Sequence, residues 1–286
     1  MSAANAPANF QSTTTAPPFA SALHPTQRSR RTDIASAATA LRGEWIKVSS
    51  LRSNRLILAS TPVIGILLSW ILATFVKIDP DTDLAFTIGA TTFFSTWLTA
   101  VLGTIVGTLL FTSEFQHGTI TTAVAAQPAR WVTVAAKSTI AAGFGLAMGV
   151  LGMIGGFSGA VLGGLETGDT SGMTTTALWG LLLATLAPLL GLGVGMILRH
   201  SAAAVSVLLV WVFVVENLVR TLIPANVHRF LPFSAANGLL GTGTGTNTPE
   251  MLAAALTRVQ DAMLFGGYAV AALTAGTILF YRRDLN

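Results

Sequence analysis

The chain has 286 residues, of which 52% are hydrophobic and 10% are charged, and its formal net charge is +4. About a quarter of the residues of an average soluble domain are charged, so this composition excludes a disordered or fibrous chain and disfavours a soluble enzyme. Cysteine is absent, which excludes a disulfide framework, a cysteine metal site and a cysteine nucleophile. The composition instead predicts a membrane protein with most of its length in lipid.

The first 55 residues divide into a tail and a helix. Residues 1–32 are rich in Ala, Ser, Thr and Pro and lack the apolar core of a signal peptide, so we predict a disordered cytoplasmic tail. In residues 33–55 five apolar residues fall on one helical face: Ile34, Ala37, Leu41, Trp45 and Val48. This stripe, with Arg52 at its edge, predicts an amphipathic helix in the membrane interface. The alternative is a plain juxtamembrane linker.

Six apolar stretches in residues 56–286 have about the 20 residues that cross a bilayer. They cover residues 56–76, 84–112, 138–165, 176–198, 202–223 and 262–281. The sequence therefore predicts an all-α polytopic integral membrane protein with six transmembrane helices. A loop at 113–137 lies on one side of the membrane. A longer loop at 224–261 lies on the other side and contains a re-entrant hairpin or a surface helix near residues 230–240.

The basic residues predict the orientation. If the N-terminus is cytoplasmic, the outer ends hold Lys77, Arg220, Arg229 and Arg258, which leaves twelve of the sixteen Lys and Arg inside. This bias follows the positive-inside rule. We therefore expect a multi-pass protein of the bacterial plasma membrane with both termini in the cytoplasm. Topology explains the basic charge, and we expect no nucleic-acid partner.

Signatures of catalysis are missing from the sequence. There is no phosphate-binding loop of the G-x-x-x-x-G-K-[ST] type. The four histidines are scattered, without metal-ligand spacing: His24, His117, His200 and His228. We therefore predict that the chain is not an enzyme, with no catalytic residue, metal site or cofactor of its own.

Two intramembrane features leave alternatives open. Glu216 and Arg220, in the fifth span, have the spacing of a helical ion pair and either line a substrate path or gate, or form a structural pair. Thr92, Thr96 and Thr99 share a face of the second span and form either a polar translocation wall or a close helix contact. The same holds for four G-x-x-x-G pairs: Gly103/Gly107, Gly145/Gly149, Gly152/Gly156 and Gly191/Gly195.

The loop after the second span carries the most informative pattern. Its polar beginning consists of Ser113, Glu114, Phe115, Gln116, His117, Gly118, Thr119 and Ile120. Pro128, Arg130 and Ala136-Lys137 follow it. A short helix over 119–124, parallel to the membrane, would be a suitable device for docking on a cytoplasmic partner.

Several patterns, in order, resemble the permease subunit of ABC-2-type transporters, a family of ATP-binding cassette exporters. They are Glu44-Trp45-x-Lys47 with Ser50-Leu51-Arg52-Ser53, the Glu114-x-x-His117-Gly118-Thr119 loop, Glu216 in a span ending Leu222-Ile223-Pro224, Leu231-Pro232-Phe233 with Ala235-Ala236, and Tyr281-Arg282-Arg283-Asp284. The resemblance covers nearly all of the chain after residue 40. The long N-terminal tail departs from the family pattern.

The resemblance implies roles that composition does not. Residues 33–55, including Glu44, Trp45, Lys47 and Arg52, would be the connecting helix, and the loop from Glu114 to Ile120 the coupling helix on a separate ATPase subunit. Glu114 and Arg130 would make polar contacts with that ATPase, and Phe115 and Ile120 apolar ones. Two permease chains, as a homodimer or heterodimer, would pass an unspecified cargo along their interface, in contact with membrane lipid, while the ATPase binds ATP and Mg. Alternatives are an ion-coupled secondary carrier, or a non-transporting immunity or sensor protein.

Overall fold

The computed structural model describes residues 30–75, 88–120, 129–165, 173–241 and 254–282. The regular elements of these residues are helices, and six of them are long and apolar enough to cross a membrane. This confirms the predicted all-α membrane fold. Residues 1–29 of the predicted disordered tail and residues 121–124 of the predicted 119–124 helix lie outside the described residues. Residues 30–32, which the sequence analysis assigned to the tail, instead form the start of a helix.

The described helices form one bundle. They are α1 (Arg30–Ser50), α2 (Arg52–Phe75), α3 (Ile88–Gln116), α5 (Arg130–Leu162), α6 (Met173–Leu198), α7 (Ser201–Val210), the π-helical turn η1 (Trp211–Val215), α8 (Glu216–Leu222), α9 (Ala225–His228), α10 (Pro232–Leu240) and α12 (Arg258–Arg282). The fifth span is α7, η1 and α8 in succession.

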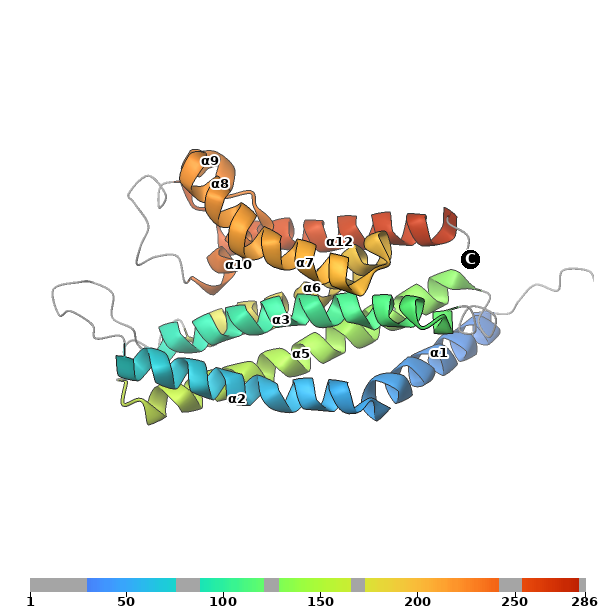
Figure 1. Ribbon diagram of the computed structural model, residues 1–286, viewed down its shortest axis with the longest axis horizontal. Coiled ribbons are helices and arrows are strands. Elements are labelled where there is room, and N and C mark those ends of the chain that lie inside the picture. The colour runs from blue at the N-terminus through green and yellow to red at the C-terminus, as the bar shows by residue number, and fades with distance from the viewer. Residues whose placement is uncertain (1–29, 76–87, 121–128, 166–172, 242–253, 283–286) are drawn as a thin grey trace, which may run out of the picture.

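Helices α3, α5 and α6 form the centre of the bundle. Helix α3 packs on both α5 and α6, α2 packs on α5, and α12 packs on α6 (Figure 1). Helix α1, the end of α3, the start of α5 and the end of α12 lie at one end of the bundle, which we call the α1 end (Figure 1). Helices α9 and α10 lie toward the opposite end, the α10 end. Both ends of the described chain therefore lie on one side, as an even number of spans requires.

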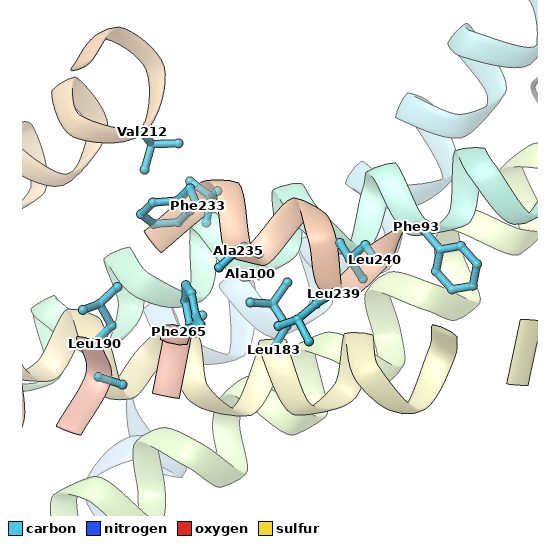
Figure 2. Close-up of a cluster of buried hydrophobic side chains, with 14 residues drawn as sticks. Phe93, Ala100, Leu183, Leu190, Val212, Phe233, Ala235, Leu239, Leu240 and Phe265 are labelled. Carbon is cyan, nitrogen blue, oxygen red and sulfur yellow. The ribbon is translucent and has the colours of Figure 1, made fainter. Parts of the chain in front are cut away.

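A cluster of apolar side chains fills the bundle near the α10 end (Figure 2). Phe233, Leu239 and Leu240 of α10 are buried in it together with Leu183 of α6 and Phe265 of α12. The sequence left open whether residues 230–240 form a re-entrant hairpin or a surface helix. Residues 232–240 do form a helix, α10, but it does not lie on the surface of the bundle, because six of its nine residues are buried.

Some helices extend beyond the predicted apolar spans. Helix α3 continues to Gln116 and α5 already begins at Arg130, so much of the predicted loop at 113–137 is helical. The reason is that polar residues in these turns, Glu114 and Lys137, satisfy each other across the two helices. The apolar stretches therefore underestimate how far these two helices extend at their polar ends.

The central helices approach closely at glycines. A Cβ on Gly107 of α3 would collide with the carbonyl oxygen of Pro188 on α6, and one on Gly191 of α6 would collide with that of Thr104 on α3. Backbones in lipid approach this closely through small residues, which increases van der Waals contact. This geometry favours packing as the role of the G-x-x-x-G pairs.

We predict that Gly191→Ala destabilises the bundle by about 2 kcal/mol, because the α3–α6 backbones must separate. The matched control is Gly267→Ala on α12, where a Cβ meets no atom within 4 Å. The control is expected to leave stability unchanged or slightly improved, since alanine favours helix more than glycine. Unfolding by sodium dodecyl sulfate, followed by circular dichroism, measures both. Equal stability of the two variants would contradict the close contact.

Candidate functional site

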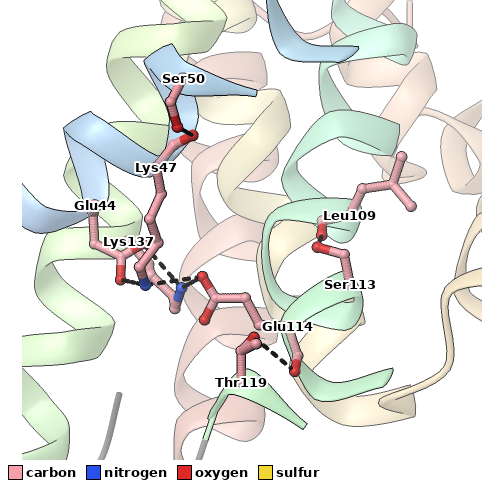
Figure 3. A network of polar contacts seen from close by, with 8 residues as sticks. All are labelled: Glu44, Lys47, Ser50, Leu109, Ser113, Glu114, Thr119 and Lys137. Carbon is pink, nitrogen blue, oxygen red and sulfur yellow. Dashed lines mark hydrogen bonds and ion pairs between the residues drawn. The ribbon is translucent and has the colours of Figure 1, made fainter. Parts of the chain in front are cut away.

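Four charged side chains from three helices meet at the α1 end (Figure 3). Lys137 Nζ on α5 lies 2.6 Å from Glu114 Oε1 on α3 and 3.0 Å from Glu44 Oε2 on α1. Lys47 Nζ, also on α1, lies 2.7 Å from Glu44 Oε1 and 3.2 Å from Glu114 Oε1. The group, which we call the four-charge cluster, has two acids and two bases and is electrically neutral.

The four members differ in exposure. The Lys137 side chain is 3% exposed and that of Glu44 is 9% exposed, whereas that of Lys47 is 44% exposed. An isolated buried charge is strongly unfavourable, and a pair survives burial only with good geometry. Lys137 is therefore the centre of the cluster, because it contacts both carboxylates from the most buried position. The cluster fixes α1 to the ends of α3 and α5.

The cluster shifts the pKa values of its α1 members in opposite directions. Burial alone would raise the pKa of Glu44, but the charge of Lys137 and hydrogen bonds from Lys47 and Lys137 outweigh it and hold that pKa below its ordinary value of 4.5. Burial alone would lower the pKa of Lys47, but the carboxylates of Glu44 and Glu114 raise it above 10.5. Both shifts favour the charged forms.

These shifts predict how stability depends on pH. The lowered pKa of Glu44 contributes stability that is complete above about pH 4.5 and is lost as the pH falls through the lowered value. The raised pKa of Lys47 contributes stability below about pH 10.5, which is lost as the pH rises through the raised value. We therefore expect the cluster to stabilise the fold between these limits. Unfolding titrations between about pH 7 and about pH 3 are expected to show an acid loss that Glu44→Gln reduces.

Three further residues that the sequence predicts to couple to the ATPase make contacts with other helices of this chain. Gln116 Oε1 accepts a hydrogen bond of 2.6 Å from Ser201 Oγ at the start of α7. The Phe115 ring lies under the guanidinium of Arg199, 4.9 Å from the ring centroid. Arg130 donates to the Phe280 carbonyl oxygen at 3.0 Å and lies over the Phe280 ring. The side chains of Phe115 and Arg130 thus join the end of α3 and the start of α5 to neighbouring helices.

The start of the segment after α3 is partly buried. Ile120 is 2% exposed and packs in a cluster with Phe111 and Phe280. The expectation that Ile120 is an apolar anchor for a partner is therefore corrected, because the core of this chain already covers its side chain. His117 and Thr119 are exposed. A ring nitrogen of His117 lies 2.6 Å from the carbonyl oxygen of Ser113, and the Thr119 hydroxyl donates to the backbone carbonyl oxygen of Glu114.

The face of α1 that packs against the bundle is not the apolar stripe that the sequence predicts. Val48 is buried, but so is Glu44, whereas the stripe residue Trp45 is 60% exposed. The ion pair of Glu44 with Lys137 explains the difference, because it rotates the acidic residue toward α5. Arg52, at the first position of α2, is exposed.

Glu216 and Arg220 both bind the first turn of α10. Glu216 is 2% exposed, and its Oε1 accepts from the backbone N–H of Phe233 at 2.8 Å and from Trp211 Nε1 at 3.1 Å. Arg220 donates to Ser234 Oγ at 3.2 Å. The ion pairs among the described residues do not include one between Glu216 and Arg220. A carboxylate at a helix N-terminus satisfies free N–H groups and the helix dipole, so this geometry favours the structural interpretation.

The threonine face of α3 is buried between helices. Thr92, Thr96 and Thr99 are each less than 5% exposed. The hydroxyls of Thr96 and Thr99 donate to carbonyl oxygens four residues earlier in α3. Thr99 also lies where a Cβ on Gly152 of α5 would be. The arrangement favours helix packing over a translocation wall.

Lys137 is the functional candidate that sequence reasoning missed as a site residue. It stands alone in an apolar helical stretch, and an ionisable residue in such a stretch needs a partner of opposite charge. That rule points to an acid, but the sequence does not say that Glu44 and Glu114 both approach it. Trp211 was missed as well, because the π-helical turn that brings it to Glu216 has no clear sequence signal.

Comparisons with protein families, with curated proteins and with solved structures gave no match.

Proposed function

We propose that the chain is the membrane-spanning permease subunit of an ATP-driven ABC-2-type exporter in the bacterial plasma membrane. The α1 end faces the cytoplasm, because most basic residues lie there. Helix α1 is the interfacial connecting helix, and its exposed Trp45 contacts the lipid headgroups. A second permease chain and two ATPase subunits complete the exporter.

The observation that supports this proposal most is the four-charge cluster. Along the chain, Glu114 precedes the segment 117–129 and lies near the end of α3, and Lys137 follows that segment near the start of α5. Their side chains nevertheless form an ion pair. Their ion pair, with Glu44 and Lys47, joins these helix ends and α1 into one unit. A force applied to the segment between α3 and α5 is then transmitted to two spans and the interfacial helix together.

The proposed mechanism uses this unit as the mechanical link. ATP closes the dimer of ATPase subunits, which hold ATP and Mg, and the segment between α3 and α5 moves with them. The permease pair then shifts between inward-open and outward-open forms. ATP drives this change only to the extent that the ATPase dimer favours one form over the other.

The side chains available to the ATPase differ from those expected from the sequence alone. Glu114, Arg130 and Ile120 contact this chain. His117 is exposed, and Trp131 is 56% exposed at the first turn of α5. We propose that His117 and Trp131 provide the contact surface, while Glu114 transmits the movement.

The proposal predicts a gene for an ABC ATPase beside that of this chain. The decisive experiment co-expresses the chain with that ATPase and measures ATP-dependent cargo flux in vesicles. The proposal requires that the two proteins co-purify and that inactivating the ATPase stops the flux. A substituted chain tests the link itself. Gly118 has a φ of +68°, which proline cannot adopt, so Glu114→Ala with Gly118→Pro is expected to reduce flux at least tenfold while ATP hydrolysis continues.

The matched control for the backbone change is Gly164→Pro. Gly164 has a φ of +77°, and at both Gly118 and Gly164 a Cβ would meet no atom within 4 Å, but Gly164 lies at the opposite end of α5. The control is expected to retain coupled flux. Flux that continues without the ATPase, or that is normal in the Glu114→Ala, Gly118→Pro variant, would refute the proposal.

A further inference from the structure

A groove of about 980 Å³ lies between α1, the start of α2 and α3. Helices α1 and α2 meet at Leu51 in a V whose corner points away from α3 (Figure 1). In Figure 3, Ser50 and Lys47 of α1 lie opposite Leu109 and Ser113 of α3. The volume is at the upper end of the range of small-molecule sites, about 300–1,000 Å³.

The groove changes from polar to apolar along its length. Its wall along α3 and the turn that follows runs from His117 through Ser113 to Leu109 and Val106, a distance of about 16 Å at 1.5 Å per residue. Ile57 of α2 continues the apolar part. The apolar end lies within two candidate spans, while the polar end lies beside α1. This gradient fits an amphiphile whose chains extend into the membrane.

The accessible charge at the polar end is positive. Lys47 lines the groove and is the most exposed member of the four-charge cluster. Arg55 does not line the groove itself, but it is exposed and donates to the carbonyl oxygen of Ser50, which does. The two acidic lining residues, Glu44 and Glu114, are 9% and 15% exposed, and Lys137 binds both. An anionic headgroup therefore meets accessible cations and neutralised acids.

We infer that this groove binds one anionic phospholipid of the surrounding membrane. Its phosphate lies at Lys47 and Arg55, which donate hydrogen bonds and charge, and an acyl chain lies along Ile57, Leu109 and Val106. The bound lipid fills the space between the V of α1 and α2 and helix α3. The inference does not depend on the proposed transport function.

The test measures lipids retained by the full chain in native mass spectrometry, after purification with equal amounts of phosphatidylglycerol and phosphatidylcholine of identical acyl chains. We expect one phosphatidylglycerol to be retained in preference to phosphatidylcholine. Each basic residue near a phosphate increases affinity about fivefold, so Lys47→Gln, which removes the basic residue that lines the groove, is expected to reduce this preference about fivefold. The control Arg42→Gln removes an exposed charge of α1 that does not line the groove, and it is expected to preserve the preference.

A second pair of variants tests the space itself. Gly43 lines the groove, and a Cβ there would meet no atom within 4 Å, so Gly43→Phe adds an aromatic ring at the groove with no clash at its Cβ. It is expected to reduce the retained phosphatidylglycerol at least tenfold. Gly143→Phe, equally unobstructed at its Cβ but on α5 outside the groove, is expected to retain it. Equal retention of the two lipids by the unmodified chain, or equal loss in the Gly43 and Gly143 variants, would overturn the inference.

Discussion

Lys137→Ala is expected to lower the free energy of unfolding by about 3 kcal/mol, because removing one partner of a buried ion pair leaves uncompensated charge. Lys137 is 3% exposed and contacts Glu44 and Glu114 at 3.0 and 2.6 Å. Without it, two largely buried carboxylates face each other with only Lys47 nearby. The measurement is unfolding by sodium dodecyl sulfate, followed by circular dichroism.

Lys47→Ala is the matched control from the same cluster. Lys47 contacts the same two carboxylates, but its side chain is 44% exposed, so water already solvates much of its charge. The expected loss is about 1 kcal/mol or less, as for exposed ion pairs. Equal losses for the two lysines would contradict the central position assigned to Lys137.

A compensating substitution separates the charge of Lys137 from its packing. Lys137→Met with Glu44→Gln and Glu114→Gln removes all three buried charges and leaves side chains of similar size. Replacing a buried ionic group by neutral residues of similar volume is often tolerated or even stabilising. We therefore expect the triple variant to recover most of the loss caused by Lys137→Met alone. If the triple variant is less stable than the single one, packing and not charge is the main role of Lys137.

The sequence predicted the number of spans correctly because their signal is strong and local. A run of about 20 apolar residues identifies a membrane helix whatever its neighbours are. The ends of α3 and α5 were harder to predict, since they contain Glu114 and Lys137. These charged residues remain in helices because they meet each other, which is a tertiary property that no window along the chain contains.

The apolar stripe of α1 illustrates the same difficulty. Helical periodicity selects Trp45 and Val48 for one face, but it assigns no energy to the ion pair that buries Glu44. The structure buries Val48 and Glu44 and exposes Trp45. Periodicity thus predicted the helix, whereas its orientation depends on a lysine 93 residues away in the chain.

Glu216→Ala is expected to cost about 3 kcal/mol, because it leaves one buried and one partly buried donor without an acceptor. The donors are the N–H of Phe233 and the indole N–H of Trp211. Trp211 reaches Glu216 through the π-helical turn, whose hydrogen bonds join residues five positions apart. Hydrogen exchange of the amides of residues 233–240 is expected to accelerate in this variant, since the first turn of α10 loses its cap.

Glu216→Gln separates this capping role from a role in proton transfer. Glutamine keeps an acceptor oxygen at the same distance from the backbone, so its expected cost is about 1 kcal/mol and exchange in α10 stays slow. A proton relay needs an ionisable group, and glutamine cannot replace it. If Glu216 acts by positioning α10, flux survives in Glu216→Gln and fails only in variants that also release α10. Loss of flux in Glu216→Gln with α10 still protected would instead assign the carboxylate a part in ion-coupled transport.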